Sequence, residues 1–180
     1  MRTFSPSKFF SISLLIGGIF GLAASATLTI EKIFLLEDPN YKLSCSLNEI
    51  LACGSIVTTE QASIFGFANS IIGVVAFPVL ITIGLVGIAG LVVPKYFLHG
   101  LMLGLSVAHI FVLWLIYQSL YVIGALCPWC MVVWAAVVPL NFLILAEYKQ
   151  GLKHYFSLAI LGTIGWFLIV LALIAARFFI

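Results

Sequence analysis

The chain has 180 residues, of which 64% are hydrophobic and only 8% are charged, against about 25% charged in an ordinary soluble domain. Eight basic and six acidic residues cannot cover the surface of a soluble globule, and a net charge of +2 provides no basic face for nucleic acid. The apolar content also excludes intrinsic disorder. The composition therefore predicts an integral membrane protein, and at roughly 20 residues per spanning helix a second folded domain does not fit.

Long stretches without a charged residue locate the membrane spans. A backbone inside lipid must satisfy its own hydrogen bonds, and stretches this long and this rich in Leu, Ala and Ile are helices rather than barrel strands. We predict an all-α integral membrane protein, a four-helix transmembrane bundle plus a fifth transmembrane helix, in one membrane domain over residues 1–180. The predicted spans cover about 9–30, 65–92, 99–122, 128–146 and 157–177.

The first span begins like a secretory signal. Arg2 and Lys8 precede an apolar run, and Ala-Ser-Ala at 24–26 resembles a small-residue cleavage site. The apolar run continues to Ile30 and resumes soon after it, so we expect an uncleaved first helix. N-terminal sequencing of the purified protein tests this, because a chain that starts near Thr27 would have one helix fewer.

The charges on the two sides of the membrane predict the topology. By parity, the outer loop at 31–63 and the turn at Gly124 lie on one side, where lysines are outnumbered by acidic residues. The other side carries Arg2, Lys8, Lys95, Lys149 and Lys153. The positive-inside rule places that side in the cytoplasm. We therefore expect a multi-pass protein of the inner (plasma) membrane with its cysteine loop facing outward, on the extracytoplasmic side.

A short amphipathic helix is expected within the outer loop. Over residues 46–59, one helical face carries Leu47, Ile50, Leu51 and Ile56. Such a face rests on a membrane surface.

All four cysteines fall on the outward side, where disulfides persist. Cys45 and Cys53 form a C-x7-C pair in the loop, and Cys127 and Cys130 belong to a Cys-Pro-Trp-Cys motif opening the fourth span. Pro favours the first helical position, so Cys127 is expected at the N-cap, where a helix stabilises a thiolate. The pattern favours two redox pairs that exchange electrons through a mixed disulfide. Structural disulfides, or a zinc site made by all four cysteines, are the alternatives.

These motifs together resemble the vitamin K epoxide reductase (VKOR) family, particularly its bacterial members. The resemblance rests on Cys45-x7-Cys53, on Phe-Ala-Asn-Ser-Ile-Ile-Gly at 67–73 and on the Cys-Pro-Trp-Cys motif, and it covers roughly residues 10–147. It implies a four-helix bundle that surrounds a quinone, with the C-x-x-C pair beside the quinone ring. In the DsbB type, another four-helix quinone reductase, the two cysteine pairs occur in the opposite order.

The resemblance implies an electron route. A reduced thioredoxin-like (DsbA-like) periplasmic protein attacks Cys45, Cys53 then attacks Cys127, and Cys130 delivers the electrons to a quinone of the ubiquinone, menaquinone or vitamin K type. Disulfide bonds are thereby made outside the cytoplasm. The alternatives of another class are a small membrane transporter and a scaffold component, each with structural disulfides.

The resemblance also implies quinone contacts. Asn69 matches a family Asn that hydrogen-bonds a quinone carbonyl, with an inter-helix hydrogen bond as its alternative role. Thr59 matches a polar loop residue near the site, better than Ser55 does. Aromatic candidates for the apolar slot that a quinone ring needs are Phe65, Phe67, Phe77, Tyr117, Tyr121, Trp129 and Trp134.

Two features depart from the family. Many bacterial relatives carry a thioredoxin-like domain after a fifth helix, whereas this sequence ends at Ile180. We expect either a separate partner protein or a truncated sequence. Trp134 stands where animal relatives have Tyr, so vitamin K epoxide chemistry and animal inhibitor sensitivity are not carried over.

Two further patterns predict packing rather than function. Gly17-x3-Gly21 and Gly100-x3-Gly104 permit close helix contacts. His109 lies in the middle of a span, and we expect it to be a satisfied structural residue.

Overall fold

The structure, a computed structural model, describes residues 3–46, 48, 50–148 and 153–179. Within these residues, five helices are long and apolar enough to cross a membrane. They are α1 (Lys8–Glu37), α3 (Ser70–Ile88), α4 (Lys95–Tyr117), α5 (Pro128–Tyr148) and α6 (Lys153–Phe178). A π-helical turn, η2 (Gln118–Ile123), continues α4. The predicted all-α membrane fold is confirmed.

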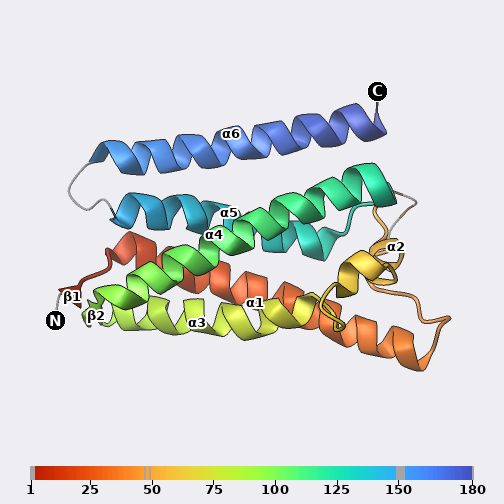
Figure 1. Ribbon diagram of the computed structural model, residues 1–180, viewed down its shortest axis with the longest axis horizontal. Helices are drawn as coiled ribbons and strands as arrows, with labels where there is room; N and C mark the ends of the chain where they lie inside the picture. The colour runs from red at the N-terminus through yellow and green to blue at the C-terminus, as the bar shows by residue number, and fades with distance from the viewer. Residues whose placement is uncertain (1–2, 47, 49, 149–152, 180) are drawn as a thin grey trace.

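Four of these helices form the bundle, and the fifth lies on its outside. Helix α1 contacts α3 and α5, α4 packs against α5, and α6 packs against α5. Figure 1 shows α6 separated by α5 from the α1–α3 pair. The N-terminus lies at one end of the bundle, and the C-terminus lies at the other end with the short helix α2 (Cys53–Val57). This arrangement agrees with an odd number of spans.

Small residues let α1 approach its neighbours closely. A Cβ added at Gly17 would lie 2.9 Å from Leu140 of α5, and one added at Gly21 would overlap the ring of Phe77 on α3. The close contact predicted for this glycine pair is confirmed.

The second glycine pair behaves differently. At Gly100 and Gly104 of α4, an added Cβ would meet no atom within 4 Å. The predicted helix contact is therefore wrong. Both glycines face a cavity between α3 and α4 instead.

Two predicted helix ends at the outer side are also wrong. Helix α1 continues past Ile30 to Glu37, because the charged side chains of Glu31 and Lys32 find polar partners in the loop and the helix does not have to end there. Helix α3 begins at Ser70 rather than near residue 65. The chain turns before it, with Gly66 at a φ of +81°, which glycine adopts at no steric cost. The outer loop therefore spans 38–69.

The loop helix is shorter than predicted. Only α2 and the 3-10 turn η1 (Glu60–Ser63) are helical in the loop, and Leu47 lies outside the described residues. The Asn48 side chain accepts hydrogen bonds from the backbone amides of residues 50 and 51, and Leu51 forms a parallel β-bridge with Leu126. These bonds hold the segment before α2 in a non-helical path beside the start of α5.

The opposite end of the bundle is closed by a small ribbon. Strand β1 (Thr3–Phe4) pairs antiparallel with β2 (Val93–Pro94). Ser7, which caps α1, donates from its backbone N and its Oγ to the Glu147 carboxylate of α5, at 2.6 and 2.9 Å. Arg2 and Lys149, two of the predicted cytoplasmic charges, lie outside the described residues.

Candidate redox site

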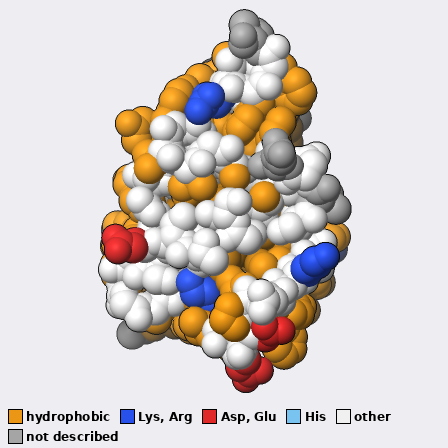
Figure 2. All heavy atoms as spheres, turned by 90° about the vertical axis from the view of Figure 1, so that its right-hand side faces the viewer, with side chains coloured by type: hydrophobic (Ala, Val, Ile, Leu, Met, Phe, Trp, Pro, Cys, Tyr) orange, Lys and Arg blue, Asp and Glu red, His pale blue; other side chains and the backbone are white. Residues whose placement is uncertain are grey.

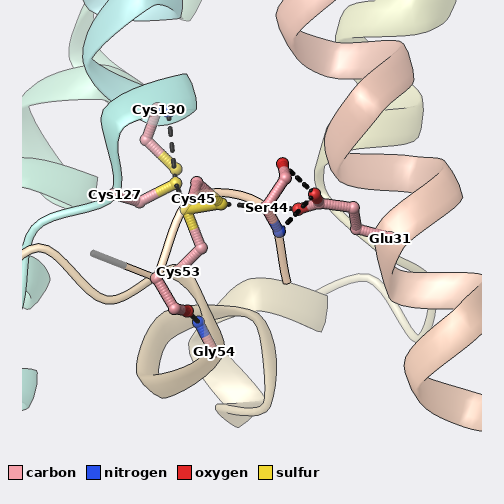
Figure 3. Close-up of a disulfide and its surroundings, with 8 residues drawn as sticks. Glu31, Ser44, Cys45, Cys53, Gly54, Cys127 and Cys130 are labelled. Atoms are coloured by element: carbon pink, nitrogen blue, oxygen red, sulfur yellow. Dashed lines mark hydrogen bonds between the residues drawn. A yellow bond between two sulfur atoms is a disulfide. The ribbon is translucent and has the colours of Figure 1, made fainter. Parts of the chain in front are cut away.

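The two cysteine pairs meet at the loop-bearing end of the bundle. Cys45 and Cys53 form a disulfide with Cα atoms 5.6 Å apart, whereas Cys127 and Cys130 are free thiols. The Sγ atoms of Cys53 and Cys127 lie 3.2 Å apart, and Figure 3 shows the four cysteine side chains gathered at this point. Thiol–disulfide exchange requires such an approach of two sulfur atoms. The structure thus brings together the four predicted cysteines.

Cys127 has the predicted N-cap position of α5. Its backbone oxygen accepts from Met131 N at 3.0 Å, and its Sγ accepts from Cys130 N at 3.3 Å. The hydrogen bond with the Cys130 side chain is the largest of the causes that lower the pKa of the Cys127 thiol. Backbone amides of Cys130 and Trp129 act in the same direction, against burial and the negative charge of Glu31. A lowered pKa favours the thiolate, which is the reactive form.

The extended end of α1 holds the loop pair in place. The Glu31 carboxylate accepts from Ser44 N at 2.9 Å and from Ser44 Oγ. The next residue, Lys32, donates from Nζ to the Val57 carbonyl at the end of α2 and to Ser63 Oγ at 3.4 Å. Neither residue was predicted to take part in the site, although two adjacent charges followed by further apolar residues indicate a helix that continues.

Three sulfur atoms also form a candidate metal cluster. Those of Cys45, Cys53 and Cys127 lie within 4.8 Å of one another. Zinc binds cysteine as thiolate, but two of these sulfurs share the disulfide. The donor set present in this structure therefore does not fit zinc.

A large apolar cavity begins beside the free thiols. Its volume is about 850 Å³, it lies between α3 and α4, and α1 and α5 contribute to its walls. This size is typical of small-molecule sites, which are mostly apolar with a few polar groups. The polar side chains toward its outer end are Ser25, Lys32, Asn69, Ser70, Cys130 and Trp134.

The predicted quinone contacts divide into two groups. Asn69, Trp134, Phe65 and Phe77 line the cavity. Five others lie outside its lining: Thr59, Phe67, Tyr117, Tyr121 and Trp129.

Those five have other surroundings. The Thr59 hydroxyl donates to Ile56 O at 2.7 Å, and Trp129 packs against the buried disulfide cluster. Phe67 is exposed. The exposed rings of Tyr117 and Tyr121 lie 5.4 Å apart, against each other. The sequence analysis did not single out Phe97 and Phe111, which line the cavity from α4.

Asn69 organises the turn that precedes α3. Its Nδ2 donates to Gln61 O at 2.7 Å, and its Oδ1 accepts from Ile64 N at 3.3 Å. The alternative of an inter-helix hydrogen bond is wrong, since both partners belong to the loop. A side-chain amide has two N–H donors, and within the described part of the chain one of them is used, which leaves the other for a molecule in the cavity.

Trp134 presents a buried donor at the cavity. The side chain is 3% exposed, and its Nε1 has no hydrogen-bond partner within the part of the chain that the structure describes. An unpaired buried donor costs about 1–3 kcal/mol. A hydrogen-bond acceptor that reached Nε1 would remove this cost.

Only one ring nitrogen of His109 has a hydrogen-bond partner among the described residues. Its Nδ1 lies 2.8 Å from Nδ2 of Asn141, whose Oδ1 accepts from Ser106 Oγ at 3.3 Å. Its Nε2 has no partner among the described residues. The expected structural role is thus met at one ring nitrogen.

Comparison with known families agrees with this geometry. Residues 12–145 match the Vitamin K epoxide reductase family. The chain belongs to the VKOR family. The matched segment contains both cysteine pairs and most of the four bundle helices, while α6 follows it. A search of curated proteins found no match. Membership makes the protein a membrane disulfide oxidoreductase of a family that uses quinones.

Proposed function

We propose that this VKOR-family protein oxidises a thioredoxin-like (DsbA-like) dithiol protein outside the cytoplasm and passes the two electrons to a membrane quinone. The observation that carries the proposal is the 3.2 Å contact between Cys53 Sγ and Cys127 Sγ. This contact joins the loop pair to the pair beside the cavity. In the structure the loop pair is oxidised and the Cys127/Cys130 pair is reduced. These are the states expected after the loop pair has passed two electrons to the Cys127/Cys130 pair.

The first exchange opens the loop disulfide. A thiolate of the partner attacks Cys45 Sγ, and Cys53 leaves with the electron pair of the broken S–S bond. The partner's second thiolate then attacks the partner sulfur that is joined to Cys45. The partner leaves as a disulfide, and Cys45 and Cys53 hold its two electrons.

The second exchange moves these electrons to the start of α5. The Cys53 thiolate attacks Cys127 in a Cys127–Cys130 disulfide, and Cys130 leaves as a thiolate. Cys45 then attacks Cys53, which restores the loop disulfide and releases Cys127. Hydrogen bonding that lowers the pKa of Cys127 makes it a good leaving group in this last step.

The cavity fits a quinone. Its apolar walls suit a quinone ring and tail, Cys130 lies at its wall, and the unpaired Nε1–H of Trp134 suits a carbonyl oxygen. When bound, a quinone supplies an acceptor for two electrons and two protons. Trp134 and the second N–H of Asn69 would hold it, and the apolar side chains exclude water. Ubiquinone, menaquinone and vitamin K type quinones share these features.

We place the cysteine loop on the periplasmic side of the inner (plasma) membrane. The proposal is supported by the basic residues of the opposite side and by a disulfide in the loop. Figure 2 shows the loop-bearing end, where acidic and basic side chains are interspersed rather than gathered by sign. This end therefore has no strongly basic face of the kind that the positive-inside rule assigns to the cytoplasm.

The test combines turnover with trapping. Purified protein receives a short-chain quinone and a reduced thioredoxin-like protein, and thiol loss is followed with quinone reduction. Cys127→Ala and Cys130→Ala should each abolish both signals. Unchanged rates would instead support a scaffold or transporter with structural disulfides. In the Cys130→Ala variant, Cys127 can still attack Cys53 in the loop disulfide, which is the reverse of the last step and releases Cys45 as a thiolate. Non-reducing peptide mapping of this variant should therefore recover a Cys53–Cys127 bridge, and finding only Cys45–Cys53 would argue against the relay.

A further inference from the structure

Glu31 is a buried carboxylate in contact with the loop disulfide. It is 4% exposed, and its Oε2 lies 3.4 Å from Cys45 Sγ while its Oε1 accepts from Ser44. Figure 3 shows the carboxylate directed from α1 toward Ser44 and Cys45. The relay described above gives this residue no role.

Cys53 is the loop cysteine in contact with Cys127, with the two sulfur atoms 3.2 Å apart, but Cys45 also lies close to Cys127. The sulfur atoms of Cys45, Cys53 and Cys127 all lie within 4.8 Å of one another, and both loop cysteines are buried. Once the loop disulfide is open, either sulfur is near enough to attack. Only the thiolate form attacks, so the distribution of protons selects the nucleophile.

The charge of Glu31 makes the two loop cysteines unequal. A carboxylate beside a thiol disfavours a second negative charge there, and an ionised carboxylate only accepts hydrogen bonds, so it suits an S–H donor. The adjacent ammonium of Lys32 donates to Val57 O and Ser63 Oγ rather than to the Glu31 carboxylate. The buried cluster that contains Cys45 also contains the titratable residues Cys53 and Cys127, and Tyr41 and Cys130 pack against this cluster.

We propose that Glu31 holds Cys45 as a neutral thiol after the loop disulfide opens, and thereby makes Cys53 the thiolate that attacks Cys127. This proposal rests on the proposed function. The incoming dithiol brings two electrons and two protons. The electrons break the Cys45–Cys53 bond, one proton stays on Cys45 in a hydrogen bond to Glu31, and the other is released when Cys53 ionises. Cys45 gives up its proton only in the last step, when it attacks Cys53 to restore the loop disulfide and Cys127 leaves.

Alkylation of the fully reduced protein tests the proposal without a quinone or a partner. The labelling rates of Cys45 and Cys53 with iodoacetamide are measured against pH by peptide mass spectrometry. In the unmodified protein, Cys45 should reach half of its maximal rate at a higher pH than Cys53. Glu31→Gln removes the charge and keeps an oxygen that can accept from Ser44. In this variant Cys45 should be alkylated roughly tenfold faster near neutral pH, because a shift of about one pH unit in the midpoint changes the thiolate fraction about tenfold.

Two controls separate charge from loosening of the loop. Glu37→Gln removes an exposed carboxylate of the same helix, and Ser44→Ala loosens the hydrogen bonds of Glu31 but keeps its charge. Neither should change Cys45 labelling by more than about twofold. Equal acceleration by Ser44→Ala would overturn the proposal, and so would an unchanged Cys45 profile in Glu31→Gln.

A second readout measures attack on Cys127 directly. In a Cys53→Ser variant whose Cys127–Cys130 pair has first been oxidised to a disulfide, only Cys45 can attack Cys127, and Cys130 leaves as a thiolate. Adding Glu31→Gln should accelerate formation of this Cys45–Cys127 bridge roughly tenfold at neutral pH. An unchanged rate would overturn the proposal. Where Glu31→Gln does not fold, the unmodified protein decides, since a Cys45 midpoint at or below that of Cys53 is incompatible with it. A protein that passes these tests but fails to reduce quinone would refute only the proposed function.

Discussion

Replacement of Gly104 by leucine should block the cavity without harming the fold. Gly104 lies inside α4, lines the cavity and has no atom within 4 Å of an added Cβ. A larger side chain there occupies the space proposed for the quinone. The thiols of Cys127 and Cys130 are on another helix and stay unchanged.

The structure allows the changes in stability and in quinone KM to be estimated. Glycine in a helix interior is less favourable than alanine by about 0.5–1 kcal/mol, and leucine has nearly the helix propensity of alanine. Because no clash opposes this gain, Gly104→Leu should be as stable as the unmodified protein or more stable by up to about 1 kcal/mol. Overfilling a site costs about 1–3 kcal/mol, which corresponds to roughly a 5- to 150-fold rise in quinone KM.

The assay compares thermal unfolding in detergent with quinone KM. Gly21→Ala is the matched control, since its Cβ would overlap the Phe77 ring and should destabilise the protein by about 1–3 kcal/mol. An unchanged quinone KM in Gly104→Leu would show that the quinone does not use this cavity. A marked loss of stability would show that Gly104 is a helix contact after all.

Three further predictions concern single side chains. Trp134→Phe removes one neutral hydrogen bond worth about 0.5–1.5 kcal/mol and should raise quinone KM roughly 2- to 13-fold. Trp166→Phe changes a residue outside the cavity lining and should leave quinone KM unchanged. An equal KM in Trp134→Phe and the unmodified protein would eliminate the indole N–H as a quinone donor. Because its pKa is lowered, Cys127 should reach half-maximal alkylation below the pH of about 8.5 for a free cysteine, and Cys130→Ala should move this midpoint upward by removing the main cause; a downward shift would contradict the assignment. Lys32→Met removes the hydrogen bonds to Val57 and Ser63 and should lower the free energy of unfolding by about 1.5–3 kcal/mol. Thermal unfolding measures this loss, and the outer loop should also be cut faster by a protease. Equal rates of proteolysis in the variant and the unmodified protein would mean that Lys32 does not anchor the loop.

Much of the fold could be predicted because lipid restricts the choices. A membrane-spanning backbone must be helical or part of a barrel, so uncharged stretches located all five helices. One error occurred where charge was taken as the end of a helix. Glu31 and Lys32 are charged but remain in α1, since the loop supplies partners that the sequence pattern does not reveal.

The parts of the site that depend on local sequence could be predicted, and those that depend on helix packing could not. The N-cap position of Cys127 depends on local rules for Pro and helix starts, and the structure confirms it. The cavity depends on how far α3 stands from α4, which no local pattern records. Gly100 and Gly104 therefore had the motif of a helix contact and proved to line an open space.

The sequence by itself determined the membrane setting, the number of helices and the gathering of four cysteines on one side. These properties depend on hydrophobicity, charge and the parity of spans, each of which can be read along the chain. Tertiary structure decided which atoms meet: the sulfur of Cys53 with that of Cys127, and the carboxylate of Glu31 with Cys45. Contacts of this kind join residues distant in the chain, and they are set by the packing of whole helices and the path of the loop.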